Sequence, residues 1–511
     1  MHTLRIKNLR SLKDTGEIEI KPLTVVVGEN SSGKSSFLRF FPLLKQTLET
    51  KRSETILWYS NRYVDFGSFN DALNKKSEDG IISFEISFSV SDDFVYRRLR
   101  NPYNFNRRIS KKVQEDNIIK VNVCIKENFV HNIDIEFNKK KISIKFNELY
   151  VKSIKINDTF IDNIKTIKII NKGYMEEILP ELIDESSEKE SLLRYESIMR
   201  FFIKKIKQDI PLEFKEKEYL LELEEIILAH FDWKDLKIKY NSKNRDLKNL
   251  INYINKDEKM KDYMFGMMLN SLISIYNMHI SDIFSNVRYI APVRANAERY
   301  YRVQGLAINE IDPKGENIAM LLYNMGKNEK NKFCKWVKDN FGFEIFTKSE
   351  GGHVSIYIRY SNEDDINIVD TGFGYSQILP IIVQLWLISY NTNSKPLYLK
   401  TNTYVLVIEQ PELHLHPAMQ GQLVDTFVKA LDVCKKNNID LRLIIETHSK
   451  SIVNRIGYLI NNKKYNFNEK KANIIIFNKK DNYESSVDKS RYDNEGYLEN
   501  WPIGFFNTRG L

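Results

Sequence analysis

The chain has 511 residues, 42% of them hydrophobic, and a formal net charge of +9. This length exceeds what one hydrophobic core usually serves, so we expect a main domain with a large insertion or partner domain. The sequence has no run of 18 apolar residues, no apolar signal core at its N-terminus, and three cysteines without metal-ligand spacing. These features argue against a membrane span, secretion and a disulfide framework, and they predict a cytoplasmic protein. The positive charge fits either a polyanionic partner or a lysine-rich composition, and both interpretations stay open.

The first elements of the chain are two short strands, residues 4–8 and 16–20, joined by a polar turn that contains Arg10. Residues 23–27 are apolar and β-branched, which predicts a buried strand, and residues 36–48 have the pattern of a helix. A glycine-rich loop connects this strand to this helix.

The loop matches the phosphate-binding pattern G-x-x-x-x-G-K-[ST] at Gly28, Gly33, Lys34 and Ser35. The glycines let the backbone N–H groups face phosphate oxygens, and the following helix adds partial positive charge at its N-terminus. We expect Lys34 to reach the β- and γ-phosphates and the Ser35 hydroxyl to ligate Mg²⁺. The other loop residues that we expect at the phosphates are Asn30, Ser31, Ser32 and Ser36.

Residues 81–285 differ in pattern from their flanks and predict an inserted α/β domain between an N-terminal lobe, 1–80, and a C-terminal lobe, 286–511. Alternating apolar and polar residues predict an antiparallel meander, and helical patterns follow from about residue 174. The predicted strands of the meander are 81–90, 118–125, 132–137 and 141–146.

A basic segment, residues 97–112, carries seven basic residues, no acidic one, and the aromatic residues Tyr103 and Phe105. This mixture suits contacts with a nucleic-acid backbone and base stacking, and a solvated loop is the rival interpretation. The candidate nucleic-acid contacts are Arg97, Arg98, Arg107 and Arg108.

The C-terminal lobe begins with a predicted strand, 287–293, followed by Arg294, Arg299 and Arg302, which are either phosphate clamps or surface charges. A hairpin is expected around Gly351 and Gly352. Residues 370–377 form a glycine-containing turn before an apolar helix, 378–389, and this helix N-terminus is a second potential anion-binding end.

The predicted strand 404–408 ends in Glu409, and a carboxylate in this place is the usual Mg²⁺ anchor through the metal's water shell. The next residue, Gln410, can orient water but cannot act as a general base, whereas Glu412 can if the turn brings it within reach. His414 and His416 precede Pro417, where a structural role is favoured over a metal pair.

A further predicted strand, 441–445, ends near His448, which at such a position can sense a γ-phosphate. The last strand is expected at residues 472–477.

This set of residues resembles the ABC-type ATPase heads shared by SMC-like proteins, RecF and the OLD (overcoming lysogenisation defect) group, over roughly residues 1–75 and 285–511. The segments VGENSSGKSSFL and IEQPELHLHP are most similar to stand-alone bacterial AAA-family ATPases, many of which lie in anti-phage defence operons beside a separate effector. The fold class implied is α/β: a P-loop NTPase of the ABC type with an N-terminal β element and a large α/β insertion.

The resemblance also implies roles for individual residues. Residues 28–35 become the Walker A loop, Glu409 ends the Walker B strand, Gln410 and Glu412 flank the catalytic-base position, and His448 is the switch histidine. Arg10 resembles an arginine that touches phosphate in these heads. A degenerate signature motif contains Gly374, Ser376 and Gln377.

By this resemblance the protein is an ATPase that uses ATP and Mg²⁺ and forms a homodimer or higher oligomer with ATP between two heads. It would couple nucleotide state to double-stranded DNA or to a separate effector protein, without a membrane. Three departures from the family pattern bear on this: the signature reads FGYSQ, the residue after Glu409 is Gln, and the 63 residues after His448 are too few for the nuclease domain of full-length OLD proteins. The alternatives are a slowly hydrolysing scaffold that restrains an effector and a RecF-like DNA-repair ATPase.

Overall fold

The computed structural model describes residues 1–92, 94–95, 116–162, 164–170, 177–185, 194–215, 218–305, 308, 310–360, 364–390 and 403–502. The chain forms two compact units. One comprises Met1–Arg5, Thr47–Ile56 and Asp79–Ser281, and the other comprises Ile6–Gln46, Leu57–Glu78 and Asp282–Leu511. The candidate nucleic-acid contacts Arg97, Arg98, Arg107 and Arg108 lie outside the described residues.

The first unit is built on an antiparallel sheet whose strands follow in the order β12-β11-β9-β8-β7-β6-β5, with β10 paired to β9. The predicted meander is confirmed, because each strand from β5 to β9 pairs antiparallel with the next. Buried and more exposed residues alternate over most of β7 and β8, as one-sided packing requires. The strands are β5 (Ile82–Ser91), β6 (Asp116–Lys126), β7 (Phe129–Phe137), β8 (Lys140–Asn147), β9 (Tyr150–Ile156), β10 (Thr159–Ile161), β11 (Ile167–Ile170) and β12 (Glu181–Asp184).

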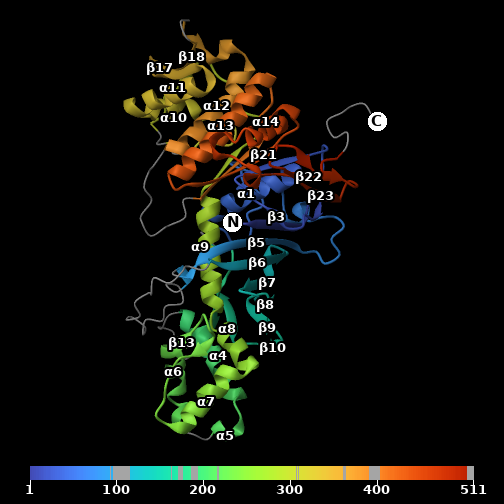
Figure 1. Ribbon diagram of the computed structural model, residues 1–511, viewed down its shortest axis with the longest axis vertical. Helices are drawn as coiled ribbons and strands as arrows, with labels where there is room; N and C mark the ends of the chain where they lie inside the picture. The colour runs from blue at the N-terminus through green and yellow to red at the C-terminus, as the bar shows by residue number, and fades with distance from the viewer. Residues whose placement is uncertain are drawn as a thin grey trace. The chain divides into compact units, whose positions relative to one another are not determined.

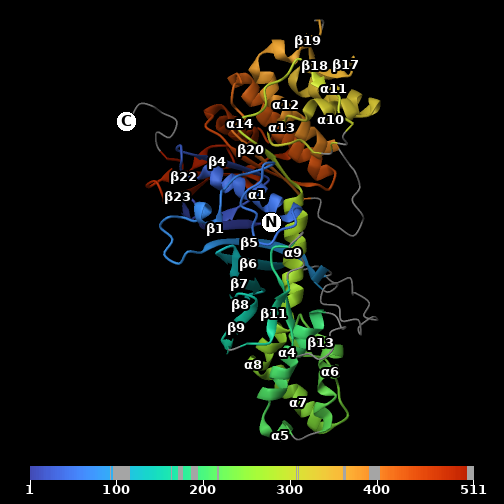
Figure 2. The ribbon, with the colours of Figure 1, turned by 180° about the vertical axis from the view of Figure 1, so that it is seen from behind.

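Helices and a small hairpin complete this unit. Helix α9 (Leu269–Ser285) runs beside the meander in both views of the ribbon (Figures 1 and 2), and Phe88 of β5 contacts its Tyr276 and His279. The remaining elements are α4 (Arg194–Asp209), α5 (Leu212–Lys215), η1 (Glu218–Leu220), α6 (Leu223–His230), β13 (Phe231–Asp232), β14 (Lys237–Ile238), α7 (Arg245–Lys256) and α8 (Glu258–Gly266).

The second unit contains a seven-stranded sheet in the order β15-β20-β21-β4-β22-β23-β24. The strands from β15 to β22 pair in parallel, whereas β23 and β24 pair antiparallel. The prediction that residues 472–477 form the last strand was wrong, because two further strands follow. The strands are β4 (Leu23–Gly28), β15 (Val287–Ile290), β20 (Thr403–Glu409), β21 (Asp440–Glu446), β22 (Ala472–Lys479), β23 (Ser485–Tyr492) and β24 (Leu498–Glu499).

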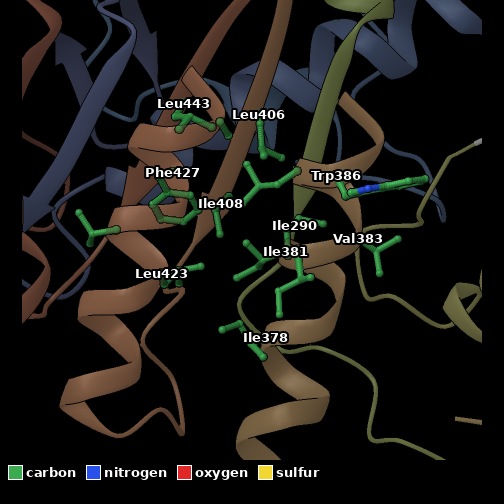
Figure 3. Packing of buried hydrophobic residues seen from close by; sticks show 14 of the residues in the cluster. Ile290, Ile378, Ile381, Val383, Trp386, Leu406, Ile408, Leu423, Phe427 and Leu443 are labelled. Carbon is green, nitrogen blue, oxygen red and sulfur yellow. The ribbon is translucent and has the colours of Figure 1, made fainter. Parts of the chain in front are cut away.

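Both faces of this sheet are covered, which explains why its central strands are apolar throughout. On one face, alternate residues such as Leu406 and Leu443 pack with helices α12 (Phe373–Tyr390) and α13 (Pro417–Lys436) (Figure 3). Buried residues of α14 (Lys450–Asn461) belong to the same hydrophobic cluster. On the other face, Phe477 of β22 contacts Phe37 of α1 (Lys34–Glu49), the helix that follows the glycine loop.

Smaller elements flank this core. The N-terminal β element consists of β1 (Thr3–Leu9), β2 (Leu12–Asp14) and β3 (Ile18–Glu19), and Arg10 lies in the tight turn between β1 and β2. The predicted strand 16–20 corresponds to β3, and β2 is an additional strand that was not predicted. The expected hairpin around Gly351 and Gly352 is confirmed by β17 (Phe343–Glu350) and β18 (His353–Tyr360). Also present are α2 (Phe69–Ala72), β16 (Tyr301–Arg302), α10 (Ile318–Asn324), α11 (Lys327–Phe341), β19 (Ile366–Asn367), η2 (Ile368–Thr371), η3 (Lys464–Asn466) and η4 (Glu469–Lys471).

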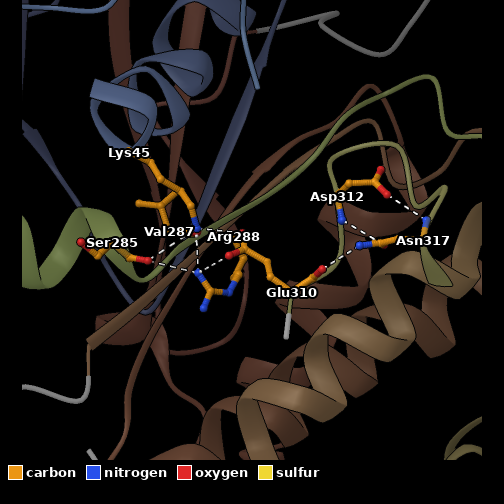
Figure 4. Close-up of polar contacts among 7 residues, drawn as sticks. All are labelled: Lys45, Ser285, Val287, Arg288, Glu310, Asp312 and Asn317. Atoms are coloured by element: carbon orange, nitrogen blue, oxygen red, sulfur yellow. Dashed lines mark hydrogen bonds and ion pairs between the residues drawn. The ribbon is translucent and has the colours of Figure 1, made fainter. Parts of the chain in front are cut away.

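A buried charge fixes α1 beside the edge strand β15 (Figure 4). The Nζ of Lys45, fully buried on α1, donates hydrogen bonds of 2.7 Å to Val287 O and to Glu310 Oε1. Glu310 also pairs with Arg288 at 3.3 Å, and its carbonyl accepts a hydrogen bond from Asn317. A buried ammonium needs such partners, so this cluster holds α1 in one orientation relative to β15.

Among the residues that the structure describes, one helix, α12, is long and apolar enough to cross a membrane by length and composition. Its mean hydropathy is 1.2, and 72% of its 18-residue window is buried inside the protein. Core helices of folded domains have the same properties, and α12 packs in the core in this way.

Candidate functional site

The predicted strand, glycine loop and helix are present as β4, residues 29–33 and α1, and two glycines give the loop its path. Gly28 has φ +149°, and a Cβ there would lie 2.1 Å from the carbonyl oxygen of Phe477 on the neighbouring strand. Gly33 has φ +91°, and its Cβ would lie 2.6 Å from the Leu12 side chain. Glycine is required at both positions, because other residues rarely adopt these φ angles and because a Cβ atom would clash with its neighbours.

The loop side chains divide into exposed and buried sets. Asn30 and Ser31 are exposed, and Ser36 is half-buried. Ser32 is buried, and its Oγ has no hydrogen-bond partner within the part of the chain that the structure describes. Buried hydroxyls normally have partners, so this oxygen suits a bound ligand.

Lys34 and Ser35 meet a carboxylate that sequence reasoning did not select, Glu446. The Ser35 hydroxyl donates to Glu446 Oε2 at 3.1 Å, and Lys34 Nζ lies 3.9 Å from Glu446 Oε1. Lys34 Nζ also donates to Glu29 O at 2.6 Å. Lys34 is 4% exposed and Glu446 3% exposed, so a cation, a hydroxyl and a carboxylate converge in a buried position.

Burial is the largest influence on the pKa values of Lys34 and Glu446. It lowers the pKa of Lys34, although the charges of Glu446 and Glu29 oppose the shift. It raises the pKa of Glu446 to about 7, and the negative charge of Glu409 adds to this shift. A bound divalent cation would favour the ionised carboxylate, because an opposite charge stabilises it.

Glu409, the predicted end of the Walker B strand, has other partners. Arg39, one turn of α1 after Ser35, donates from Nε and Nη2 to its two carboxylate oxygens at 2.8 and 3.0 Å. The Tyr289 hydroxyl of β15 donates to Glu409 Oε1 at 2.7 Å. Burial disfavours the charged guanidinium, but these contacts with Glu409 outweigh it and raise the pKa of Arg39 above its usual value.

Arg294 is one of the three arginines that follow β15. It is not a surface charge, and its hydrogen bond goes to the turn after β20 and not to the phosphate loop. It is buried, and its Nη2 donates to Glu409 O at 2.9 Å. Burial lowers its pKa to about 10. Arg299 instead pairs with Asp370 on the surface. Arg294 therefore stabilises the turn after β20 through its hydrogen bond to Glu409 O.

The turn after β20 connects to His448. Gln410 has φ +46°, and its N–H donates to Glu446 O at 2.9 Å. Glu412 Oε1 accepts a hydrogen bond from the backbone N–H of His448 at 2.7 Å. Burial raises the pKa of Glu412 despite this bond, and desolvation with the nearby charge of Lys34 lowers the pKa of His448.

A cavity of about 310 Å³ opens beside the loop. Its walls include residues 31–36, Arg10 from the N-terminal turn, Lys75, and Asn482 and Tyr483 from the β22–β23 connection. The Nδ2 of Asn74 donates to the carbonyl oxygens of both Arg10 and Tyr483, so one buried amide joins two walls. The Arg10 guanidinium lies 4.4 Å from the Phe66 ring centroid.

The predicted signature residues do not line this cavity. They lie in the first turns of α12, where Ser376 and Gln377 are buried and the Ser376 hydroxyl donates to Phe373 O at 2.8 Å. A Cβ at Gly374 would lie 3.0 Å from His414 O. Phe373, at the start of the helix, is 63% exposed and is the residue of this motif that faces solvent.

The groups around Ser35, beside the cavity, suit Mg²⁺. Ser35 and Glu446 supply hydroxyl and carboxylate oxygens, the donors that this cation prefers. Within the described ranges no group of three or more His, Cys, Asp or Glu side chains could hold a metal by itself. His416 is the N-cap of α13 and its Nδ1 accepts from Ala418 N, in keeping with the structural role expected for this histidine.

The residues missed from the sequence are Glu446, Arg39 and Tyr289. Glu446 carried a usable signal, since it ends an apolar strand just as Glu409 does. Arg39 lies four residues after Ser35, so it faces the same side of α1. No local pattern identifies Tyr289, because its role depends on the pairing of β15 with β20.

Comparison with known proteins shows that the AAA ATPase domain family matches residues 1–453. Endonuclease GajA of Bacillus cereus (strain HuB5-5) is 24% identical over 388 residues, which cover 68% of this chain and 54% of GajA. This chain thus spans about half the length of that relative. Solved structures that are similar include an SMC head bound to the C-winged helix domain of ScpA (12% identity, TM-score 0.35, 96% of each chain) and the SMC head domain from Thermotoga maritima (11% identity, TM-score 0.34, 96% of this chain and 98% of that one).

Proposed function

Because the chain belongs to the AAA ATPase domain family, we propose that it binds ATP together with Mg²⁺ and hydrolyses it. The observation that carries this proposal is the convergence of Lys34, Ser35 and Glu446 beside a glycine loop at the N-terminus of α1. A helix N-terminus and a lysine together suit a triphosphate, and the adjacent oxygen donors suit the cation that accompanies it.

In this proposal each residue has a defined role. Loop N–H groups and Lys34 hold the β- and γ-phosphates, and Ser35 with a strand-end carboxylate holds Mg²⁺, which offsets negative charge on the phosphates when bound. Water attacks the γ-phosphorus, the bond from this phosphorus to the β–γ bridging oxygen breaks so that ADP leaves with that oxygen, and the proton of the water passes to an oxygen of the released phosphate. Gln410 orients that water, and Glu412 positions His448 through its backbone N–H.

The cavity wall also includes residues that suit binding of the nucleoside. Lys75, Asn482 and Tyr483 line the cavity along with the phosphate loop, and an aromatic ring with amide groups suits a purine base. We therefore expect ATP to bind more tightly than inorganic tripolyphosphate, because only ATP contacts both the phosphate loop and these residues.

Calorimetric titration of the purified chain with ATP and Mg²⁺ tests this function. Lys34→Ala should weaken ATP binding by about 10- to 100-fold, since a charged hydrogen bond contributes about 1.5–3 kcal/mol. Lys13→Ala removes an exposed lysine and should leave the affinity unchanged. Equal ATP affinity in the wild type and Lys34→Ala would contradict the proposal, and a tripolyphosphate titration would measure the share of the nucleoside.

The proposed assembly is an ATP-dependent homodimer or higher oligomer in which the start of α12 faces the loop of a second copy. Phe373, at the start of α12, is 63% exposed, so its side chain is accessible to a second copy. Double-stranded DNA and a separate effector protein are the proposed partners, and the similarity to an endonuclease supports DNA. A role in anti-phage defence is proposed from the resemblance of the segments VGENSSGKSSFL and IEQPELHLHP to ATPases of defence operons. Mass measurement with and without ATP tests the dimer.

A second candidate function is a nucleotide-gated scaffold that holds ATP, turns over slowly and restrains an effector. Gln410 favours this candidate, because the residue after Glu409 cannot accept a proton. Tight ATP binding without turnover would select the scaffold.

A further inference from the structure

Two buried carboxylates end adjacent parallel strands of the second unit. Glu409 ends β20 and Glu446 ends β21, and the two residues are paired in register. Strand β21 lies directly beside β4, the strand that enters the glycine loop, whereas β20 lies one strand further away. The strand order therefore places Glu446, and not Glu409, next to the loop.

The hydrogen bonds separate the two carboxylates further. Both oxygens of Glu409 accept from Arg39, and Oε1 also accepts from Tyr289. This carboxylate is 1% exposed, so moving it toward Ser35 would break three hydrogen bonds in a site that water does not reach. Hydrogen bonds to charged groups contribute about 1.5–3 kcal/mol each, which makes such a movement costly.

Glu446 instead contacts the two side chains that the loop motif directs to the cation and the phosphates. Ser35 donates to its Oε2, and Lys34 lies within ion-pair distance of its Oε1. The backbone carbonyl of Glu446 accepts from the N–H of Gln410, so the turn after β20 is attached to it as well.

We propose that Glu446, and not Glu409, is the carboxylate of the divalent-cation site formed with Ser35. Glu409 has a different role, because through Arg39 and Tyr289 it joins α1, β15 and β20 and thereby positions Ser35. This inference deepens the proposed function and rests on it.

Electron paramagnetic resonance with Mn²⁺ and ADP tests the assignment, because Mn²⁺ replaces Mg²⁺ and ADP prevents turnover during the measurement. The matched variants are Glu446→Gln and Glu409→Gln, which remove one charge each at almost unchanged volume. Loss of a metal-site carboxylate should weaken Mn²⁺ binding in the presence of ADP by about 10- to 100-fold in Glu446→Gln. Glu409→Gln, which disturbs Ser35 only through Arg39 and α1, should weaken Mn²⁺ binding less than Glu446→Gln does and should lower the thermal unfolding midpoint.

Nucleotide binding in EDTA separates this inference from the proposed function. Both variants should bind ADP in EDTA as the wild type does, whereas a wild type that binds no nucleotide would refute the function itself. Equal or greater loss of Mn²⁺ affinity in Glu409→Gln would overturn the assignment. Glu446→Asp keeps the charge and withdraws the carboxylate by one methylene, so it should fold and still lose Mn²⁺ affinity; wild-type affinity in this variant would also overturn it.

Discussion

At the scale of single residues, the site depends on how its buried charges are paired. Arg39 neutralises Glu409 through two parallel hydrogen bonds, and such bidentate pairs are among the strongest polar contacts in proteins. Glu446 has no comparable arginine pairing in the described part of the chain, and its contacts are those of the phosphate loop. The proposed division of the two acids into a structural one and a cation-binding one rests on this difference.

Arg39→Ala should destabilise the second unit by about 3–5 kcal/mol, because it leaves the buried Glu409 without its counter-ion. Urea unfolding monitored by circular dichroism measures the change. Arg455→Ala is a matched control, since Arg455 has a similar exposure and its partner Asp425 is partly exposed. The control should cost at most about 1 kcal/mol. A similar loss of stability in both variants would show that Glu409 does not need Arg39.

At the scale of elements, helix α9 carries a histidine that packs as an apolar ring. His279 stacks on Phe88 with ring centroids 3.9 Å apart, and its Nε2 is buried without a hydrogen-bond partner in the described residues. Burial lowers its pKa well below 6.5, and the N-terminal amine and His2 add positive charge nearby. The native state therefore keeps this ring neutral.

This histidine should make the first unit sensitive to acid. Below pH 6.5 the unfolded chain binds a proton at His279 that the native state excludes, so the stability present above pH 6.5 is lost as the pH falls, by about 1.4 kcal/mol per pH unit. His279→Phe should keep the stack and reduce this loss, whereas His353→Phe, at an exposed position, should not. Unfolding free energies at two pH values on either side of 6.5 check the prediction, and an unchanged slope in His279→Phe would refute it.

The elements also show which features sequence patterns can predict. The strand, glycine loop and helix of the site were predictable because their signals are local and apolar. Strand β23 was missed because Ser485–Tyr492 is a polar strand near the edge of the sheet, with few buried residues. Helix α12 begins at Phe373, whereas the prediction began it at residue 378. The first turn was missed because it contains Gly374 and polar residues, which lack the apolar pattern of the rest of the helix.

At the scale of the whole chain, the order of the strands in the sheet determines which residues meet at the site. The parallel neighbours of β4 come from distant parts of the sequence, β21 on one side and β22 on the other. Hydrophobic patterns predict each strand but not its neighbour, so the sequence alone did not place Glu446 beside Ser35. Contacts between copies of the chain belong to this scale as well, and they remain proposals.

The steady-state rate of phosphate release from ATP in Mg²⁺ tests the central claim most directly, namely that Lys34, Ser35 and the strand-end carboxylates form a working ATPase site. The wild type should release phosphate, and Lys34→Ala should lower the rate by about 10- to 100-fold or more, since the lysine charge is lost where the γ-phosphate reacts. Phosphate release at equal rates in both proteins would contradict the site. Tight ATP binding with no release by the wild type would contradict the enzyme and select the scaffold.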